Sequence, residues 1–348
     1  MLGMNVIEVV IGLLFIYLLL SLLASIIGEI ITGLLSLRGR FLRLTISKFI
    51  DDDKNSLSKD FLKHPFFRKI SPPSNLRWLK KVKLPSYLSR EDFSKIFLES
   101  ILGQNTDDGF LVGEVSFNKV KNKINKLQEG QTKQLLLSLV NEAEQADDKL
   151  AKFRENLEKG YDSLMDRASG WYKRRTQFFL FIIGLLIAFA FNADTFTITN
   201  RLSKDPELRK QMVEMAETFQ ANADTVGLQQ YYEMSVAKKM HPDFVSQLKE
   251  LGEEDSAKVL ALYSNSLQLQ ELMREDLSPV QSMLGLGSIT TLQIPNDTRG
   301  FWPITAWIAL KLLGWILTAL AISLGAPFWF DMLNKVMKMR SSGKVSKA

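Results

Sequence analysis

The residue types that most often perform catalysis or bind metals are scarce in this chain. It has no cysteine, and its two histidines, His64 and His241, lie far apart in polar segments. Without thiols there is no disulfide, no thiolate metal site and no cysteine nucleophile. Neither histidine belongs to a recognised nucleophile motif, and no phosphate-binding glycine loop or zinc-ligand spacing occurs. The sequence therefore predicts no enzymatic activity, no cofactor and no metal, and leaves open only a catalytic pair of carboxylates.

A few charged residues lie where an ion site or an ion pair could form. Asp51-Asp52-Asp53 could bind a cation, but three adjacent acids more often form a solvated turn, and we favour the turn. Lys311 and Glu8 lie within long apolar runs. A lysine in hydrocarbon costs on the order of 3 kcal/mol, so it has to pair, line a wet cavity or extend to the interface. We hypothesise that Lys311 pairs with Glu8; the alternative is a lysine whose long stem reaches the interface.

Small and polar residues recur at helical spacing inside two of the apolar runs. Small residues spaced four apart allow helix backbones to approach closely in lipid. Such a face suits either the packing of helices within one chain or self-assembly of several copies around a pore, and both interpretations stay open. The residues of the two faces are Ser21, Ser25, Glu29 and Gly33 in the first run, and Lys311, Gly314, Thr318 and Gly325 in the last.

Three apolar runs are long enough to cross a bilayer. About 20 apolar residues span a hydrocarbon core of about 30 Å, because a helix rises about 1.5 Å per residue. We predict transmembrane helices at residues 1–37, 176–198 and 301–331. The first five residues carry no basic side chain, which favours a retained anchor over a cleaved signal peptide. The runs divide the chain into two polar regions and a tail.

The basic residues next to these runs predict an orientation. Residues 38–175 hold 28 Lys and Arg against 19 Asp and Glu, whereas residues 194–299 hold 10 against 16. Basic residues near span ends favour the cytoplasmic side. We therefore expect the N-terminus outside, a basic cytoplasmic domain at 38–175, an acidic external domain at 199–300 and a basic cytoplasmic tail at 332–348.

Local signals predict that both polar regions are helical. Ser89 with Asp92 resembles a capping box, and Asp205-Pro206-Glu207 and His241-Pro242-Asp243 are typical helix starts. Apolar residues from Leu150 to Trp171 form one stripe, which predicts a stalk helix that runs into the second span. Residues 279–297, in contrast, favour a loop or a short hairpin. The residues at the stalk's end could bind anionic lipid as an ordinary interfacial anchor: Trp171, Tyr172, Lys173, Arg174 and Arg175.

Several stretches together carry a family resemblance. They are residues 64–65, 85–88, 165–177 (MDRASGWYKRRTQ) and 323–335 (SLGAPFWFDMLNK). On these residues the chain resembles a widespread family of uncharacterised bacterial inner-membrane proteins. The resemblance implies a location in the bacterial inner membrane, and it implies no reaction.

The sequence as a whole predicts a mainly α protein with three transmembrane helices, a helical cytoplasmic domain and a helical external domain. The favoured function is a non-enzymatic scaffold or anchor that links a cytoplasmic partner to an external one. We expect a homo-oligomer in a lipid bilayer, with protein partners on both faces and no nucleic acid. The alternatives are an oligomeric channel or pore-forming effector and, third, a membrane enzyme.

Overall fold

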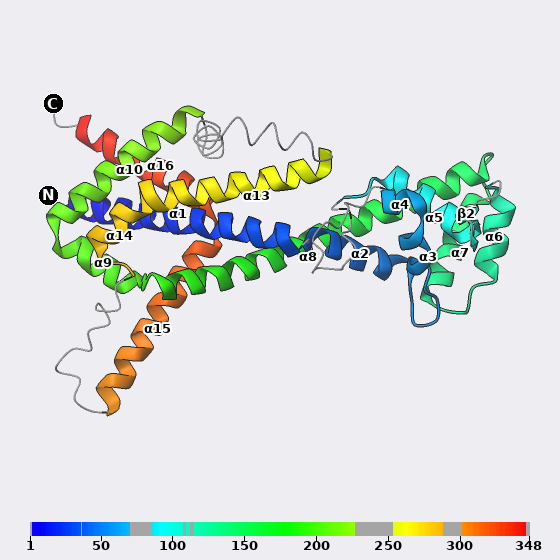
Figure 1. The fold of residues 1–348 in the computed structure, drawn as a ribbon, viewed down its shortest axis with the longest axis horizontal. Coiled ribbons are helices and arrows are strands. Elements are labelled where there is room, and N and C mark those ends of the chain that lie inside the picture. The colour runs from blue at the N-terminus through cyan, green and yellow to red at the C-terminus, as the bar shows by residue number, and fades with distance from the viewer. Residues whose placement is uncertain are drawn as a thin grey trace. The chain divides into compact units, whose positions relative to one another are not determined.

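The computed structural model describes residues 2–35, 37–69, 85, 87–106, 109–111, 115–226, 253–287 and 301–345. These residues are mainly helical, which confirms the predicted class (Figure 1). The chain divides into two compact units. Unit 1 comprises Met1–Gly33 and Arg175–Ala348, and unit 2 comprises Leu34–Arg174. Each unit has its own apolar core.

Unit 2 consists of short helices packed on the first part of a long one. Its bounds lie close to those of the predicted domain at 38–175. Its only described strands, β1 and β2, pair antiparallel with Gln104 opposite Leu111. In chain order its elements are α2 (Leu37–Ile50), α3 (Ser58–Lys63), α4 (Pro65–Lys69), α5 (Arg90–Leu102), β1 (Gln104–Thr106), β2 (Gly109–Leu111), α6 (Phe117–Asn125), α7 (Gln131–Ala143) and the start of α8 (Lys149–Ala190).

Aromatic rings from several helices form the centre of the unit 2 core. The Phe93 ring is fully buried and stacks on the Tyr161 ring of α8, with centroids 4.3 Å apart. It also contacts the ring of Phe61 in α3 at 5.4 Å. Each buried ring removes a large apolar area from water. The aromatic contacts therefore fasten α3 and α5 to α8.

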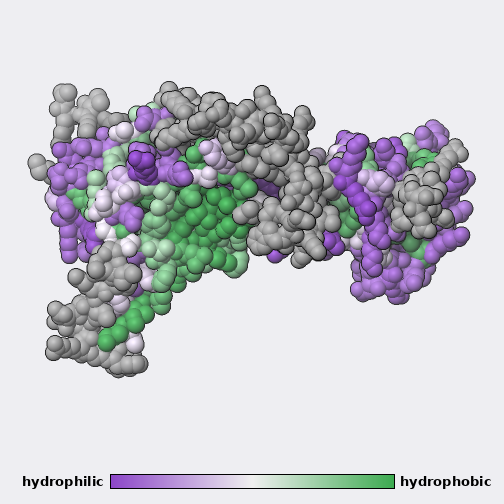
Figure 2. Space-filling view, viewed as in Figure 1, coloured by the Kyte–Doolittle hydropathy of each residue, from purple (hydrophilic) through white to green (hydrophobic). Residues whose placement is uncertain are grey.

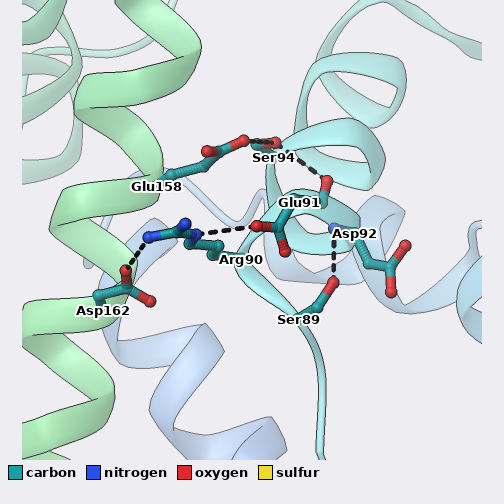
Figure 3. Close-up of polar contacts among 7 residues, drawn as sticks. All are labelled: Ser89, Arg90, Glu91, Asp92, Ser94, Glu158 and Asp162. Carbon is teal, nitrogen blue, oxygen red and sulfur yellow. Dashed lines mark hydrogen bonds and ion pairs between the residues drawn. The ribbon is translucent and has the colours of Figure 1, made fainter.

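Polar contacts fix α5 against α8 at the edge of this core, as Figure 3 shows. The backbone N–H of Asp92 donates to Ser89 Oγ at 3.0 Å, which confirms the predicted cap. Ser94 Oγ donates to the Glu158 carboxylate at 2.6 Å, and Arg90 lies 3.3 Å from Asp162. Because the Arg90 pair is about half exposed, it adds little to stability and serves mainly to set the register of the two helices.

The acidic triplet forms a structural turn. Asp52 accepts hydrogen bonds from the backbone N–H groups of Asn55 and Thr132, at 2.6 and 2.9 Å. Desolvation opposes ionisation here, yet hydrogen bonds from Thr132, Asn55 and Lys54 outweigh it and lower the pKa of Asp52. No group of acids and histidines among the described residues could hold a metal ion. The hydrogen bonds that Asp52 accepts from Asn55 and Thr132 fit the turn interpretation.

Unit 1 is arranged around α1 (Leu2–Leu35). In the 18-residue stretch of α1 that is apolar enough to span a membrane, 78% of the residues are buried within the protein. Its neighbours come from the second half of the chain, for example Leu202 and Met212 against Gly12. The remaining elements are the end of α8, α9 (Thr195–Lys204), α10 (Pro206–Val226), α13 (Glu253–Glu271), the π-helix η1 (Leu272–Leu277), α14 (Ser278–Leu284), α15 (Phe301–Ser323) and α16 (Ala326–Val345).

The predicted second span, 176–198, is bent. The helix α8 ends at Ala190, Asn192 adopts a left-handed conformation with φ of 48°, and α9 starts at Thr195. The two helix axes differ by 54°. Asp194 causes the restart, because its carboxylate accepts the free backbone N–H of Phe196 at 3.0 Å. The stalk prediction is confirmed, since α8 runs without interruption from Lys149 into the apolar run.

The predicted third span, 301–331, differs from the structure. The helix α15 ends at Ser323, and α16 begins at Ala326 after Gly325, whose φ is +88°. Glycine readily adopts this left-handed conformation, and the proline that follows cannot donate to a continuing helix. The helix α16 then packs on α1, where the rings of Trp329 and Tyr17 lie 4.9 Å apart. The run is therefore two helices joined by a tight turn.

The predicted separate domain at 199–300 also differs from the structure. The described residues 199–226 and 253–287 belong to unit 1 and share the core of α1. Their apolar faces explain this, since Met212 is fully buried and Phe219 packs edge-on against Phe15. The helix start at Pro206 is confirmed. The predicted loop at 279–297 is wrong for α14, and the predicted start at His241 lies outside the described residues.

Two or three described helices could span a membrane. Asn5–Gly33 and Ile304–Ser323 are long and apolar enough, and the bent α8–α9 pair passes as a third if it counts as one span. Figure 2 shows an apolar surface in green over α1, α8 and α15 of unit 1. The exposed apolar side chains in these helices include Phe178, Ile182, Leu186 and Phe189 of α8 and Ile308, Leu312, Leu313, Ile316 and Leu320 of α15.

Candidate functional site

A buried ion pair lies at the bend between α8 and α9. Lys311 Nζ on α15 is 3.1 Å from Asp194 Oδ2, and the two side chains are 12% and 5% exposed. Thr197 donates to the same carboxylate oxygen at 2.7 Å and accepts from Lys311 at 3.2 Å. The hypothesis that Lys311 pairs with Glu8 is wrong. Asp194 is the partner because the same carboxylate that caps α9 faces α15.

Gly314 admits the Asp194 carboxylate. One turn along α15 from Lys311, a Cβ atom on Gly314 would collide with Asp194 Oδ1. A larger residue here would push α15 away from the bend. Gly314, which was predicted to allow close helix packing, therefore makes room for the Asp194 side chain of the same chain.

Three hydroxyl groups close to this ion pair in the chain link three helices through hydrogen bonds. Tyr17 Oη on α1 lies 2.9 Å from Thr195 Oγ1, which lies 2.9 Å from Thr318 Oγ1. Thr318 also lies 3.0 Å from the carbonyl oxygen of Gly314. Buried polar groups that are fully paired make a packing unique, because any shift leaves one of them unsatisfied. We define the polar cluster as Tyr17, Asp194, Thr195, Thr197, Lys311 and Thr318.

A second charged group lies near the start of α1. Glu8 is 3.5 Å from both Arg209 of α10 and Arg340 of α16, and Arg340 also pairs with Glu217. Arg209 donates to the carbonyl oxygen of Leu202 at 2.9 Å. Glu8 and Arg340 therefore lie side by side. The prediction that puts the start of α1 and the C-terminal tail on opposite membrane faces conflicts with this contact.

The small and polar faces show mainly contacts within the chain. Ser21 is fully buried and its Oγ donates to the carbonyl oxygen of Ile322 at 3.4 Å. Ser25 is half-buried, whereas Glu29 and Gly33 are exposed. Sequence reasoning missed Gly184, where an added Cβ would lie 3.0 Å from Ile322. Its position inside the most apolar part of α8 is the signal that could have identified it.

The predicted lipid-contact residues occupy the surface of α8. Trp171 is 40% exposed, and Lys173, Arg174 and Arg175 are exposed as well. Tyr172 is half-buried against the ring of Phe41 at 5.3 Å. Their exposure agrees with a surface role and does not by itself identify a ligand.

His64 is buried in unit 2 beside Glu99, a partner that sequence reasoning did not predict. His64 Nε2 lies 3.0 Å from the Glu99 carboxylate, and Nδ1 accepts the backbone N–H of Phe66 at 3.3 Å. Burial lowers the pKa of His64, with a further contribution from Lys95, although Glu99 opposes the change. The neutral ring can accept at Nδ1, as it does from Phe66, while Nε2 lies beside the Glu99 carboxylate.

This pKa predicts how the stability of unit 2 depends on pH. Because the pKa of His64 is lower in the folded state, the unfolded chain takes up a proton first as the pH falls from about 7 to about 5. We expect the free energy of unfolding to fall by at most about 1.4 kcal/mol per pH unit in this window. Hydrogen exchange of unit 2 amides, corrected for intrinsic rates, measures the slope. His64→Gln should remove it and His241→Gln should leave it; an unchanged slope in His64→Gln would contradict the assignment.

Comparisons with protein-family models, curated proteins and solved structures find no match. The family resemblance of residues 165–177 and 323–335 therefore stays a prediction. Function has to be argued from the geometry of the two units.

Proposed function

We propose that the protein is a non-enzymatic membrane scaffold, in which unit 1 anchors unit 2 to a bilayer so that unit 2 can bind a protein partner. The observation that carries this proposal is where the apolar side chains lie. In unit 1 they are exposed along the second half of α8 and along α15, whereas the large apolar side chains of unit 2 are mostly gathered in its own core. This division suits one unit in lipid and one in water.

The exposure of α15 is the strongest part of this argument. In its 18-residue apolar stretch only 22% of the residues are buried, and Leu310, Leu312 and Leu320 are 58%, 49% and 49% exposed. A continuous apolar surface of this kind is unfavourable in water and marks contact with a membrane or a protein. Lipid is the favoured contact, because the exposed residues surround most of the helix. The middle of α1, in contrast, is buried by protein.

The charges favour a cytoplasmic position for unit 2 in a bacterial inner membrane. Arg38, Arg40 and Arg43 precede the unit's core, and residues 173–175 precede the apolar part of α8. The Glu8–Arg340 contact favours both ends of the chain on the opposite, external side. The proposed topology therefore differs from the predicted one in the C-terminal tail, which lies outside. The N-terminus and residues 199–300 stay outside, and residues 38–175 stay in the cytoplasm.

A channel has less support than a scaffold. The polar residues that would line a pore, Lys311, Gly314 and Thr318, contact residues of their own chain. A homo-oligomer remains part of the proposal, as do partners on both faces. No observation on the described residues favours an enzyme.

Arginine substitutions on α15 test the anchor. An arginine near the centre of a span costs about 2.5–3.5 kcal/mol on insertion scales, so we expect Leu312→Arg with Ile316→Arg to release much of the full-length protein from membranes in alkaline carbonate. The wild-type protein should stay in the membrane pellet. The matched control is Tyr87→Arg with Leu135→Arg, which alters two exposed apolar residues of unit 2 and should stay in the pellet. Wild-type protein in the soluble fraction would refute the anchor.

Photo-cross-linking tests the scaffold. A photoreactive amino acid at Tyr87 or Leu135, both exposed on unit 2, would be activated in intact membranes containing the full-length protein. We expect one reproducible protein adduct from at least one of these positions. Adducts with lipid alone, or none, would argue against a partner on this unit.

A further inference from the structure

Two basic segments that are far apart in the sequence lie against each other in unit 2. The ring of Phe41 in α2 is 5.3 Å from that of Tyr172 in α8, and Lys48 Nζ lies 4.5 Å above the ring of Trp171. Further along, Phe49 packs where a Cβ on Gly160 would lie 3.1 Å away. The helix α2 therefore runs antiparallel to the end of the stalk. The exposed cations near Phe41 and those near Tyr172 therefore lie on the surface at the same end of this helix pair.

This surface is positively charged and has no acid of its own. Neither α2 nor residues 167–174 contain Asp or Glu. The exposed cations are defined here as the basic collar: Arg38, Arg40, Arg43, Lys173 and Arg174. None of the five forms an ion pair with another residue in the part of the chain that the structure describes. Their charges are therefore available to an external anion.

Apolar groups lie among these charges. Leu44 of α2 is 61% exposed between Arg43 and Lys48, and Trp171 is 40% exposed beside Lys173. An exposed tryptophan and leucine among cations are typical of the boundary between headgroups and acyl chains. A surface for nucleic acid needs cations but gains nothing from an exposed leucine. Along α8, the next exposed large apolar residue after Trp171 is Phe178, four residues after Arg174.

We propose that the basic collar binds the phosphate groups of anionic phospholipids of the bilayer that holds the protein. This inference rests on the proposed membrane anchor and adds the lipid class that it selects. The guanidinium groups of α2 and α8 bind the phosphates, and Trp171 and Leu44 enter the interface beside them. The cation–π contact from Lys48 holds the Trp171 ring in place, and the ring contact from Phe41 holds Tyr172.

Lipid selectivity of the full-length protein tests the collar. The protein is reconstituted in phosphatidylcholine nanodiscs with a trace of spin-labelled phosphatidylglycerol or spin-labelled phosphatidylcholine, and electron spin resonance gives the fraction of immobilised label. Each Lys or Arg near an anionic membrane surface contributes about 1 kcal/mol, which corresponds to a roughly fivefold change in affinity for anionic lipid. We expect the wild type to prefer phosphatidylglycerol by roughly fivefold or more, and Arg40→Gln/Arg43→Gln/Lys173→Gln/Arg174→Gln to lower the preference to about one.

Two controls separate the collar from general charge and from misfolding. Lys54→Gln/Lys59→Gln/Lys123→Gln/Lys126→Gln removes four exposed cations elsewhere in unit 2 and should keep the preference. Arg40→Lys/Arg43→Lys/Arg174→Lys keeps the charge and should also retain it. Equal loss in both glutamine variants, or retention in both, overturns the proposal. It is also overturned if the wild type shows no lipid preference but binds a short DNA duplex through the collar.

The outcomes distinguish this proposal from the anchor itself. A protein that resists carbonate extraction yet shows no lipid preference refutes the collar and leaves the anchor intact. Extraction of the wild-type protein by carbonate would refute the membrane anchor, and with it the collar proposal that rests on it.

Discussion

Lys311→Met is expected to destabilise unit 1 by about 3–5 kcal/mol, which is the typical cost of removing one partner of a buried ion pair. The substitution keeps a long apolar stem but leaves the Asp194 carboxylate, 5% exposed, without its cation. Thr197 would lose the hydrogen bond that it accepts from Lys311. Unfolding in mixed micelles with increasing sodium dodecyl sulfate, followed by far-ultraviolet circular dichroism, measures the change.

A double variant shows which carboxylate is the partner. Asp194→Asn combined with Lys311→Met removes both charges, and we expect it to regain at least about half of the lost stability, because no unpaired charge remains. Glu8→Gln combined with Lys311→Met should regain nothing, since Glu8 pairs with Arg209 and Arg340. Recovery in the Glu8 combination alone would restore the rejected Lys311–Glu8 hypothesis.

Phe93→Ala is expected to lower the free energy of unfolding of unit 2 by about 3–5 kcal/mol, the usual range for deleting a buried phenylalanine side chain. The Phe93 ring is fully buried and contacts four other rings, so the cavity would open in the middle of the core. Hydrogen exchange of the unit 2 amides in the full-length protein measures the loss.

A matched aromatic deletion provides the control for this prediction. Tyr87 is 74% exposed, so Tyr87→Ala should change the same free energy by less than about 0.5 kcal/mol. Similar losses for the two variants would show that the aromatic core does not stabilise unit 2. A loss confined to unit 1 amides would contradict the division of the chain into two cores.

The sequence predicted best those features that depend on neighbouring residues. The cap at Ser89, the start of α10 at Pro206 and the uninterrupted stalk are each determined within one or two turns of helix. The alternation of apolar and basic segments likewise sufficed to locate the helices that could span a membrane. These signals are local, so no knowledge of distant contacts is needed to interpret them.

The partners of the charged residues could not be predicted in this way. Spacing puts Lys311 inside a helix but does not say which carboxylate faces it, because Asp194 approaches only after the α8 helix bends. The return of α16 along α1 depends on the left-handed Gly325. The apolar residues on both sides of Gly325 favoured a single span.

The enclosed position of α1 has a consequence for biosynthesis. The apolar helix α1 leaves the ribosome before the helices that cover its middle, such as α10 and α16, which come from the later part of the chain. At about 5–20 residues per second, roughly 15–60 s pass before α16 is made. During this time α1 needs a temporary apolar environment, such as lipid, an insertase or a chaperone. In the folded protein, contacts with the later helices replace this temporary apolar environment.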